Sequence, residues 1–213
     1  MNLYNNFVYP MVERISFPAG FEVIEGLLEM NSLVGGIVIT HPHPLYGGDM
    51  DNPVVEAIAR PCRAKGYSIL KFNFRGVGNS TGRYENGFGE QEDVQGAIKY
   101  LQARGVVNVD LAGYSFGTHV NVGAVRNGAP VRRLILVSPP VAVMDPGEPE
   151  PIPSLKLVIT GSRDDIAPPE AIKKILPRWN PEAILEVIEG ADHFYTGHLK
   201  TIVSVLSPHI ATI

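Results

Sequence analysis

A serine flanked by small residues is the feature of this sequence best suited to chemistry. It is Ser115, in the run Gly113-Tyr114-Ser115-Phe116-Gly117. The apolar residues 107–112 before it predict a buried strand, and residues 118–125 after it predict a helix. A serine at such a junction needs a tight turn, which the glycines permit. The turn lifts the hydroxyl out of the sheet and exposes it as a nucleophile.

An acid and a histidine follow this serine along the chain. Asp164 lies in Gly161-Ser162-Arg163-Asp164-Asp165, and His193 lies in Gly190-Ala191-Asp192-His193-Phe194. Imidazole suits a general base because its ordinary pKa lies near neutral pH, and a carboxylate behind the ring holds the useful tautomer. Both residues follow predicted strands, and the carboxyl ends of parallel strands share one edge of a sheet. The sequence therefore predicts that Ser115, His193 and Asp164 meet at that edge.

The elements that must position these residues alternate along the chain. Strands are predicted at 12–17, 21–29, 35–40, 68–74, 107–112, 133–137, 155–160 and 184–188, and helices at 53–65, 90–104, 118–125 and 199–206. The first two strands predict an antiparallel pair, joined at Pro18-Ala19-Gly20. The alternation that follows favours the α/β class, with a mostly parallel central sheet covered by helices on both faces.

Length and composition limit the possible classes of protein. The 213 residues fit a single domain spanning 1–213, and the net charge of -4 with no basic run predicts no nucleic-acid or membrane partner. No apolar stretch reaches the ~18 residues that a membrane span needs. Residues 1–9 lack the pattern of a signal peptide, and Cys62, the only cysteine, excludes an internal disulfide. A cytoplasmic location is therefore expected. No feature of the sequence indicates an oligomeric state.

Four motifs together give the chain a recognisable resemblance. They are Thr40-His41-Pro42-His43-Pro44, the run Phe72-Asn73-Phe74-Arg75-Gly76-Val77-Gly78-Asn79-Ser80, the Ser115 turn, and the loops of Asp164 and His193. Over nearly its whole length the chain resembles the α/β-hydrolase superfamily, and most of all its small, lidless, dienelactone-hydrolase-like branch. The resemblance implies hydrolysis of an ester or thioester through an acyl-enzyme, with no cofactor. It also implies that the acid is Asp164, three residues after the glycine, and not Asp165.

Two departures from the family pattern bear on the site. Dienelactone hydrolases carry a cysteine nucleophile where this chain has Ser115, and many hydrolases have His-Gly where this chain has His41-Pro42. An oxyanion hole needs two N–H donors, of which the first is expected from Phe116, just after the serine. Proline has no N–H, so the second donor must come from His43 or Leu45. Position favours the backbone of His43.

A lid domain often enters this type of fold in the connection that corresponds to residues 138–153. Here that connection has sixteen residues, six of them proline, which is too short to build a lid. The sequence therefore predicts a site open to solvent.

Other patterns have competing interpretations. His41, His43, Asp49 and Asp51 lie within eleven residues and are potential metal ligands, but the oxyanion loop already accounts for their position, so no metal is predicted. The glycines of 76–78 have the wrong spacing for a dinucleotide loop and favour tight turns. His119 lies one helical turn after Ser115, where packing is the favoured role.

The expected function is that of a serine hydrolase acting on small or medium carboxylic esters or thioesters, with peptide-like amides left open. The expected partner is the small-molecule ester itself. A non-catalytic α/β-hydrolase-fold binding scaffold is the alternative, and the complete set of Ser115, Asp164 and His193 argues against it.

Overall fold

The computed structural model describes residues 12–145 and 150–212, and all bounds below refer to these. The expectation for residues 1–9 lies outside the described residues. The strands are β1 (Val12–Ala19), β2 (Glu22–Glu29), β3 (Gly35–Thr40), β4 (Ser68–Phe72), β5 (Asn108–Tyr114), β6 (Leu134–Val137), β7 (Leu155–Gly161) and β8 (Ile184–Ile188). The α-helices are α1 (Pro53–Ala64), α2 (Glu90–Ala103), α3 (Phe116–Arg126), α4 (Pro169–Trp179) and α5 (Leu199–Leu206).

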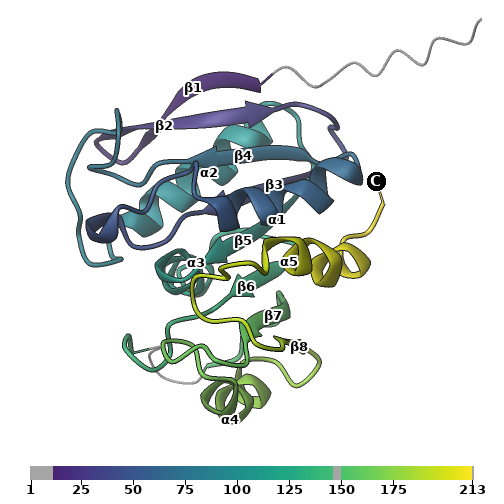
Figure 1. The fold of residues 1–213 in the computed structure, drawn as a ribbon. Helices are drawn as coiled ribbons and strands as arrows, with labels where there is room; N and C mark the ends of the chain where they lie inside the picture. Colours follow the sequence, from purple (N-terminus) through teal and green to yellow (C-terminus); the bar gives the residue numbers. More distant parts are fainter. Residues whose placement is uncertain (1–11, 146–149, 213) are drawn as a thin grey trace, which may run out of the picture.

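The eight strands form one twisted sheet in the order β1-β2-β4-β3-β5-β6-β7-β8 (Figure 1). β1 pairs with β2 and β2 with β4 in antiparallel register, while every pair from β4 to β8 is parallel. The expected α/β class with a mostly parallel sheet is therefore confirmed. Because β3, β5, β6, β7 and β8 all run the same way, their carboxyl ends meet at one edge of the sheet.

Helices cover both faces of the sheet, and each face has its own core. On one face α2, α3 and α4 pack against the sheet, and on the other α1 and α5 do so (Figure 1). Side chains of β3 alternate between the two, with Val38 in the first core and Ile37 and Ile39 in the second. All six residues of β3 are buried, as expected for a strand covered on both faces.

Local signals explain where α1 begins. Asn52 caps α1 by accepting a hydrogen bond from the N–H of Val54, and Pro53 takes the first helical position, where a missing N–H costs nothing. The structure also contains α4, a helix that the sequence pattern did not specify. It begins after Pro168, and its last residue, Trp179, packs in the core of that face.

The connection between β6 and β7 contains no helix or strand in its described part, which excludes residues 146–149. In the described part of the chain no helix is both long and apolar enough to cross a membrane.

Candidate active site

Ser115 occupies a strained turn between β5 and α3. Its backbone has φ +53° and ψ -121°, a conformation that is costly for a residue with a side chain. Its N–H donates to the carbonyl of Val137 at 2.9 Å, which ties the turn to β6. A Cβ added at Gly113 or Gly117 would overlap the hydroxyl of Thr40, so both flanking positions need glycine. This sharp turn places the serine side chain at the carboxyl edge of the sheet.

The three residues expected to act together are joined by hydrogen bonds. Ser115 Oγ lies 2.9 Å from His193 Nε2, and His193 Nδ1 lies 2.9 Å from Asp164 Oδ1 and 3.0 Å from Oδ2. All three side chains are buried. The order serine, imidazole, carboxylate is the arrangement that activates a hydroxyl, because the ring can take the hydroxyl proton while the carboxylate holds the ring.

Asp164 is held from several sides. Oδ1 accepts the backbone N–H groups of Ile166 at 3.0 Å and Ala167 at 2.7 Å, and Oδ2 accepts the hydroxyl of Ser138 at 2.6 Å. Burial raises the pKa of this carboxyl, but hydrogen bonds from His193 and Ser138 outweigh burial and hold the pKa below its ordinary value. Asp164 is therefore a fixed carboxylate at neutral pH, whereas Asp165 is exposed.

Three hydroxyl-bearing residues that support the site were missed by the sequence reasoning. Tyr195 Oη lies 2.7 Å from Ser138 Oγ, and because Ser138 gives its proton to Asp164, the tyrosine is the donor in this second bond. The hydroxyl of Tyr114 donates to the carbonyl of His193 at 2.8 Å. Ser138 and Tyr195 both have positive φ, +49° and +55°. The position of Ser138 directly after β6 was a usable signal, but nothing in the sequence marks Tyr195.

Phe116 and His43, the two expected oxyanion donors, both line the cleft at Ser115. Phe116 is the first residue of α3, and in the described part of the chain no hydrogen bond uses its N–H or that of His43. The N–H of Leu45, the competing donor, is already bonded to His43 Nδ1 at 3.2 Å. His43 Nε2 lies 3.2 Å from Tyr84 Oη, and its ring packs 4.8 Å from that of Phe116. The ring therefore fixes the loop that carries the His43 N–H.

The two histidines that were considered as metal ligands form hydrogen bonds within the protein. His41 Nε2 accepts the N–H of Phe74 at 3.0 Å, so its proton is on Nδ1, which donates to the carbonyl of Pro42 at 2.7 Å. Burial lowers the pKa of His41 to about 4, so the ring is neutral. Asp49 accepts the N–H of Asp51. Within residues 12–145 and 150–212 there is no group of three or more potential metal ligands.

The remaining sequence candidates have structural roles or lie elsewhere. Arg75, at the start of the glycine-rich segment, pairs with buried Asp93 at 2.9 Å. Cys62 is buried, and burial raises the pKa of its thiol to about 12, so it is not nucleophilic at neutral pH. His119 does not line the cleft at Ser115 but a second cleft on the other side of the β6 connection.

The cleft above Ser115 has a volume of about 560 Å³ and is mostly apolar. Among the described residues that line it, none is an Asp, Glu, Lys or Arg. Tyr46 and Phe194 stand at its mouth with 88% and 68% of their surfaces exposed. This lining suits an uncharged group with apolar or aromatic parts.

No protein-family model matches the chain. The chain is 30% identical over 188 residues to an uncharacterised protein, RP471, of Rickettsia prowazekii (strain Madrid E), covering 83% of this chain and 78% of that protein. It is similar to an α/β serine hydrolase homologue from Coxiella burnetii, with a TM-score of 0.86 and 31% identity over 95% of this chain and all of the other.

A second solved structure, XC6422 from Xanthomonas campestris, is described as an α/β serine hydrolase without a lid. Its TM-score is 0.79 at 28% identity, covering 94% of this chain and 97% of that protein. The likeness to both hydrolases extends over nearly the whole chain and agrees with the sheet order, the serine turn and the short β6–β7 connection. The chain therefore belongs to the α/β-hydrolase superfamily, among the serine hydrolases that lack a lid.

Proposed function

We propose that this protein is a serine hydrolase that cleaves carboxylic esters through a covalent acyl-enzyme. Ser115 Oγ attacks the acyl carbonyl while His193 Nε2 takes the hydroxyl proton. The tetrahedral oxyanion is stabilised by the N–H groups of Phe116 and His43. When the intermediate collapses, His193 returns the proton to the leaving alcohol and the acyl group stays on Ser115. Water, deprotonated by His193, then attacks the acyl-enzyme and releases the acid.

The observation that carries this proposal is the unbroken chain of hydrogen bonds from Ser115 through His193 to Asp164, with each step at 2.9 Å. A serine kept only for packing has no need of a buried imidazole at this distance. The strained backbone of Ser115 adds support, because strain of this kind is retained where a side chain must be aimed at a ligand.

The lining of the cleft narrows the substrate class. A charged substrate would find no opposite charge among the lining residues within 12–145 and 150–212, whereas Tyr46, Val143 and Phe194 offer apolar surface. We therefore propose neutral esters of small or medium size as substrates. Thioesters fit the same cleft, since their acyl group and carbonyl are the same.

The test is a pair of serine variants measured on p-nitrophenyl acetate and butyrate. Ser115→Ala should lower kcat by several orders of magnitude while leaving the melting temperature nearly unchanged. Ser204→Ala is the matched control, since Ser204 is exposed on α5. Its kcat should equal that of the wild type. Retention of more than roughly a tenth of wild-type kcat by Ser115→Ala would refute Ser115 as the nucleophile.

A fluorophosphonate probe with intact-mass readout separates the hydrolase from the non-catalytic scaffold. The wild type and Ser204→Ala should gain one adduct per chain and Ser115→Ala none. An unmodified wild type would favour the scaffold. The single domain over residues 1–213, the cytoplasmic location and the absence of nucleic-acid and membrane partners stay predictions.

A further inference from the structure

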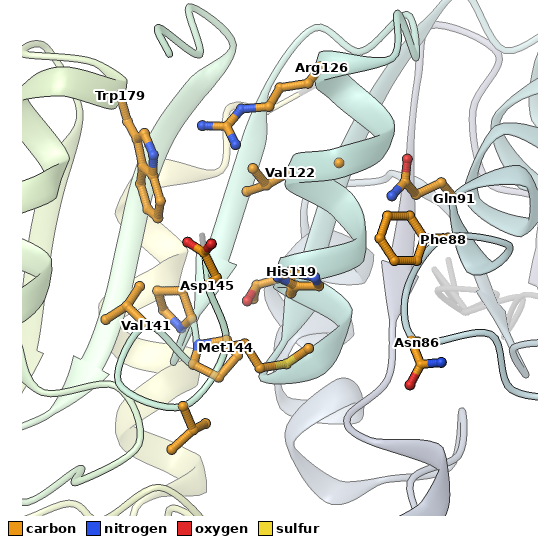
Figure 2. A pocket seen from close by; sticks show the side chains of 15 residues that line it. Asn86, Phe88, Gln91, His119, Val122, Arg126, Val141, Met144, Asp145 and Trp179 are labelled. Carbon is orange, nitrogen blue, oxygen red and sulfur yellow. The ribbon is translucent and has the colours of Figure 1, made fainter. Parts of the chain in front are cut away.

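A second cleft lies beside the one at Ser115. It has a volume of about 500 Å³ and opens between α3, the connection after β6 and the end of α4 (Figure 2). His119, Val122 and Arg126 line it from one side of α3, and Trp179 faces them from the opposite wall. The proposed reaction uses none of these four residues.

The two clefts share a wall. Pro140, Val143 and Met144, all from the connection after β6, line both of them. Val143 is 67% exposed, so a flexible chain that leaves the first cleft can pass over it into the second. The distance is short, because His119 follows Ser115 by four residues of helix, which is about 6 Å along the axis.

The chemistry of the second cleft favours an uncharged apolar occupant. Phe88 stands at its rim with 79% of its surface exposed, and Val122, Val141 and Trp179 supply further apolar lining. Burial lowers the pKa of His119, which keeps its ring neutral at pH 7. Among the described residues that line it, the charged ones are one cation, Arg126, and one anion, Asp145, so these side chains favour neither sign of charge.

We propose that this second cleft binds the far end of the acyl group of a medium-chain ester. The inference rests on the proposed function and deepens it, by adding a specificity site for neutral acyl chains that outreach the first cleft. Apolar surface that is exposed in the free protein then becomes covered by substrate. Each methylene that enters the cleft should raise kcat/KM by up to about fourfold.

The position of His193 indicates that the acyl part of the ester, and not the alcohol part, extends toward the second cleft. The leaving oxygen must sit next to His193 Nε2, which protonates it. His193, Phe194 and Ile166 line only the first cleft. The alcohol part of the bound ester therefore extends toward these residues, and the acyl part extends toward Val143 and Met144.

The kinetic test compares two exposed phenylalanines. Phe88→Ala removes the rim of the second cleft, and Phe21→Ala is the matched control, since Phe21 is fully exposed in the turn between β1 and β2. On p-nitrophenyl acetate, butyrate, octanoate and decanoate below their critical micelle concentrations, Phe88→Ala should lower kcat/KM for decanoate at least tenfold and leave acetate within twofold of wild type. Phe21→Ala should match the wild type throughout.

A second arm of the kinetic test varies the alcohol. Acetates of butanol, octanol and decanol should be hydrolysed equally well by wild type and Phe88→Ala. A loss confined to the long alcohols would overturn the assignment to the acyl part. Equal behaviour of Phe88→Ala and Phe21→Ala on decanoate would overturn the proposal for the cleft.

A binding measurement keeps the inference separate from the catalytic proposal. Trp179 is the only tryptophan of the chain, so its fluorescence reports on the second cleft alone. In the Ser115→Ala background, methyl decanoate should change this fluorescence in a saturable way, and methyl acetate should not. Adding Phe88→Ala should weaken the apparent affinity at least tenfold.

If methyl decanoate causes no saturable change in the Trp179 fluorescence, the proposal that the second cleft binds acyl chains is refuted, even if the protein proves to be an esterase. A saturable change in a protein without esterase activity would leave the cleft as an acyl-binding site and refute the proposed function instead.

Discussion

Replacing Asp164 by asparagine tests the hydrogen-bond pattern of the site most directly. Oδ1 of Asp164 accepts the N–H groups of Ile166 and Ala167, so the asparagine must keep its oxygen at that position. Its NH₂ group then takes the place of Oδ2, which faces Ser138 and His193. The hydroxyl of Ser138 can rotate and accept, but His193 Nδ1 now faces one acceptor and one NH₂ donor in place of two acceptors. The tautomer with its proton on Nδ1 therefore loses its preference, and the tautomer with its proton on Nε2 becomes populated. That tautomer presents a proton to Ser115 Oγ in place of a lone pair.

The size of the effect follows from the loss of the base. A serine hydroxyl without a proton acceptor keeps the oxyanion donors and substrate binding but loses nucleophile activation. We expect kcat of Asp164→Asn to fall by about 10³–10⁴, which corresponds to about 4–5.5 kcal/mol in the activation free energy. The neighbouring carboxylate provides an internal control, because Asp165 is exposed and Asp165→Asn should keep kcat within about twofold of wild type.

The assay is the initial rate of p-nitrophenyl butyrate hydrolysis at saturating substrate, with melting temperatures to verify that both variants are folded. Raising the pH should partly restore Asp164→Asn, since hydroxide can replace the missing base, and should do nothing comparable for Asp165→Asn. The tautomer argument is wrong if Asp165→Asn is the variant with the large loss of kcat, or if kcat of Asp164→Asn stays within tenfold of wild type.

Four further predictions concern the surroundings of the site. Ser138→Ala removes one hydrogen bond to a buried carboxylate and should lower kcat about tenfold with little change in KM, measured by steady-state kinetics. The pKa of His41 is about 4 in the folded protein against 6.5 ordinarily, so the unfolded chain binds the extra proton first as the pH falls. The free energy of unfolding should therefore drop by about 3 kcal/mol from this group between pH 7 and pH 4, and urea titrations of His41→Gln should lack that component. EDTA should leave the initial rate unchanged, because the ring nitrogens of His41 and His43 are already hydrogen-bonded; a loss restored by a divalent ion would contradict this. Finally, the rate should show no sharp increase above the critical micelle concentration of a long-chain ester, since the connection after β6 is too short to form a lid that opens.

Much of the fold could be predicted from the sequence because its signals are local. Apolar runs such as residues 35–40 and 155–160 mark strands buried on both faces, and both appear at nearly the expected bounds as β3 and β7. The serine turn also has a local signal, the glycines at 113 and 117. The contact that requires them, the close approach of Thr40, comes from a distant part of the chain. The segment that became α4 was harder to recognise, since a proline at each end and Pro177 within it obscure the helical pattern.

The sequence by itself determined which kinds of residue meet at the sheet edge, since chain order and strand ends place Ser115, Asp164 and His193 there. Only the tertiary structure decided how they are held. Ser138 and Tyr195 are 57 residues apart, and their hydroxyls meet because β6 and the loop after β8 end at the same edge. The second cleft is likewise formed by segments distant in sequence, around His119, Val143 and Trp179. Side-chain direction and cavity shape depend on such long-range packing, which leaves no periodic pattern in the sequence.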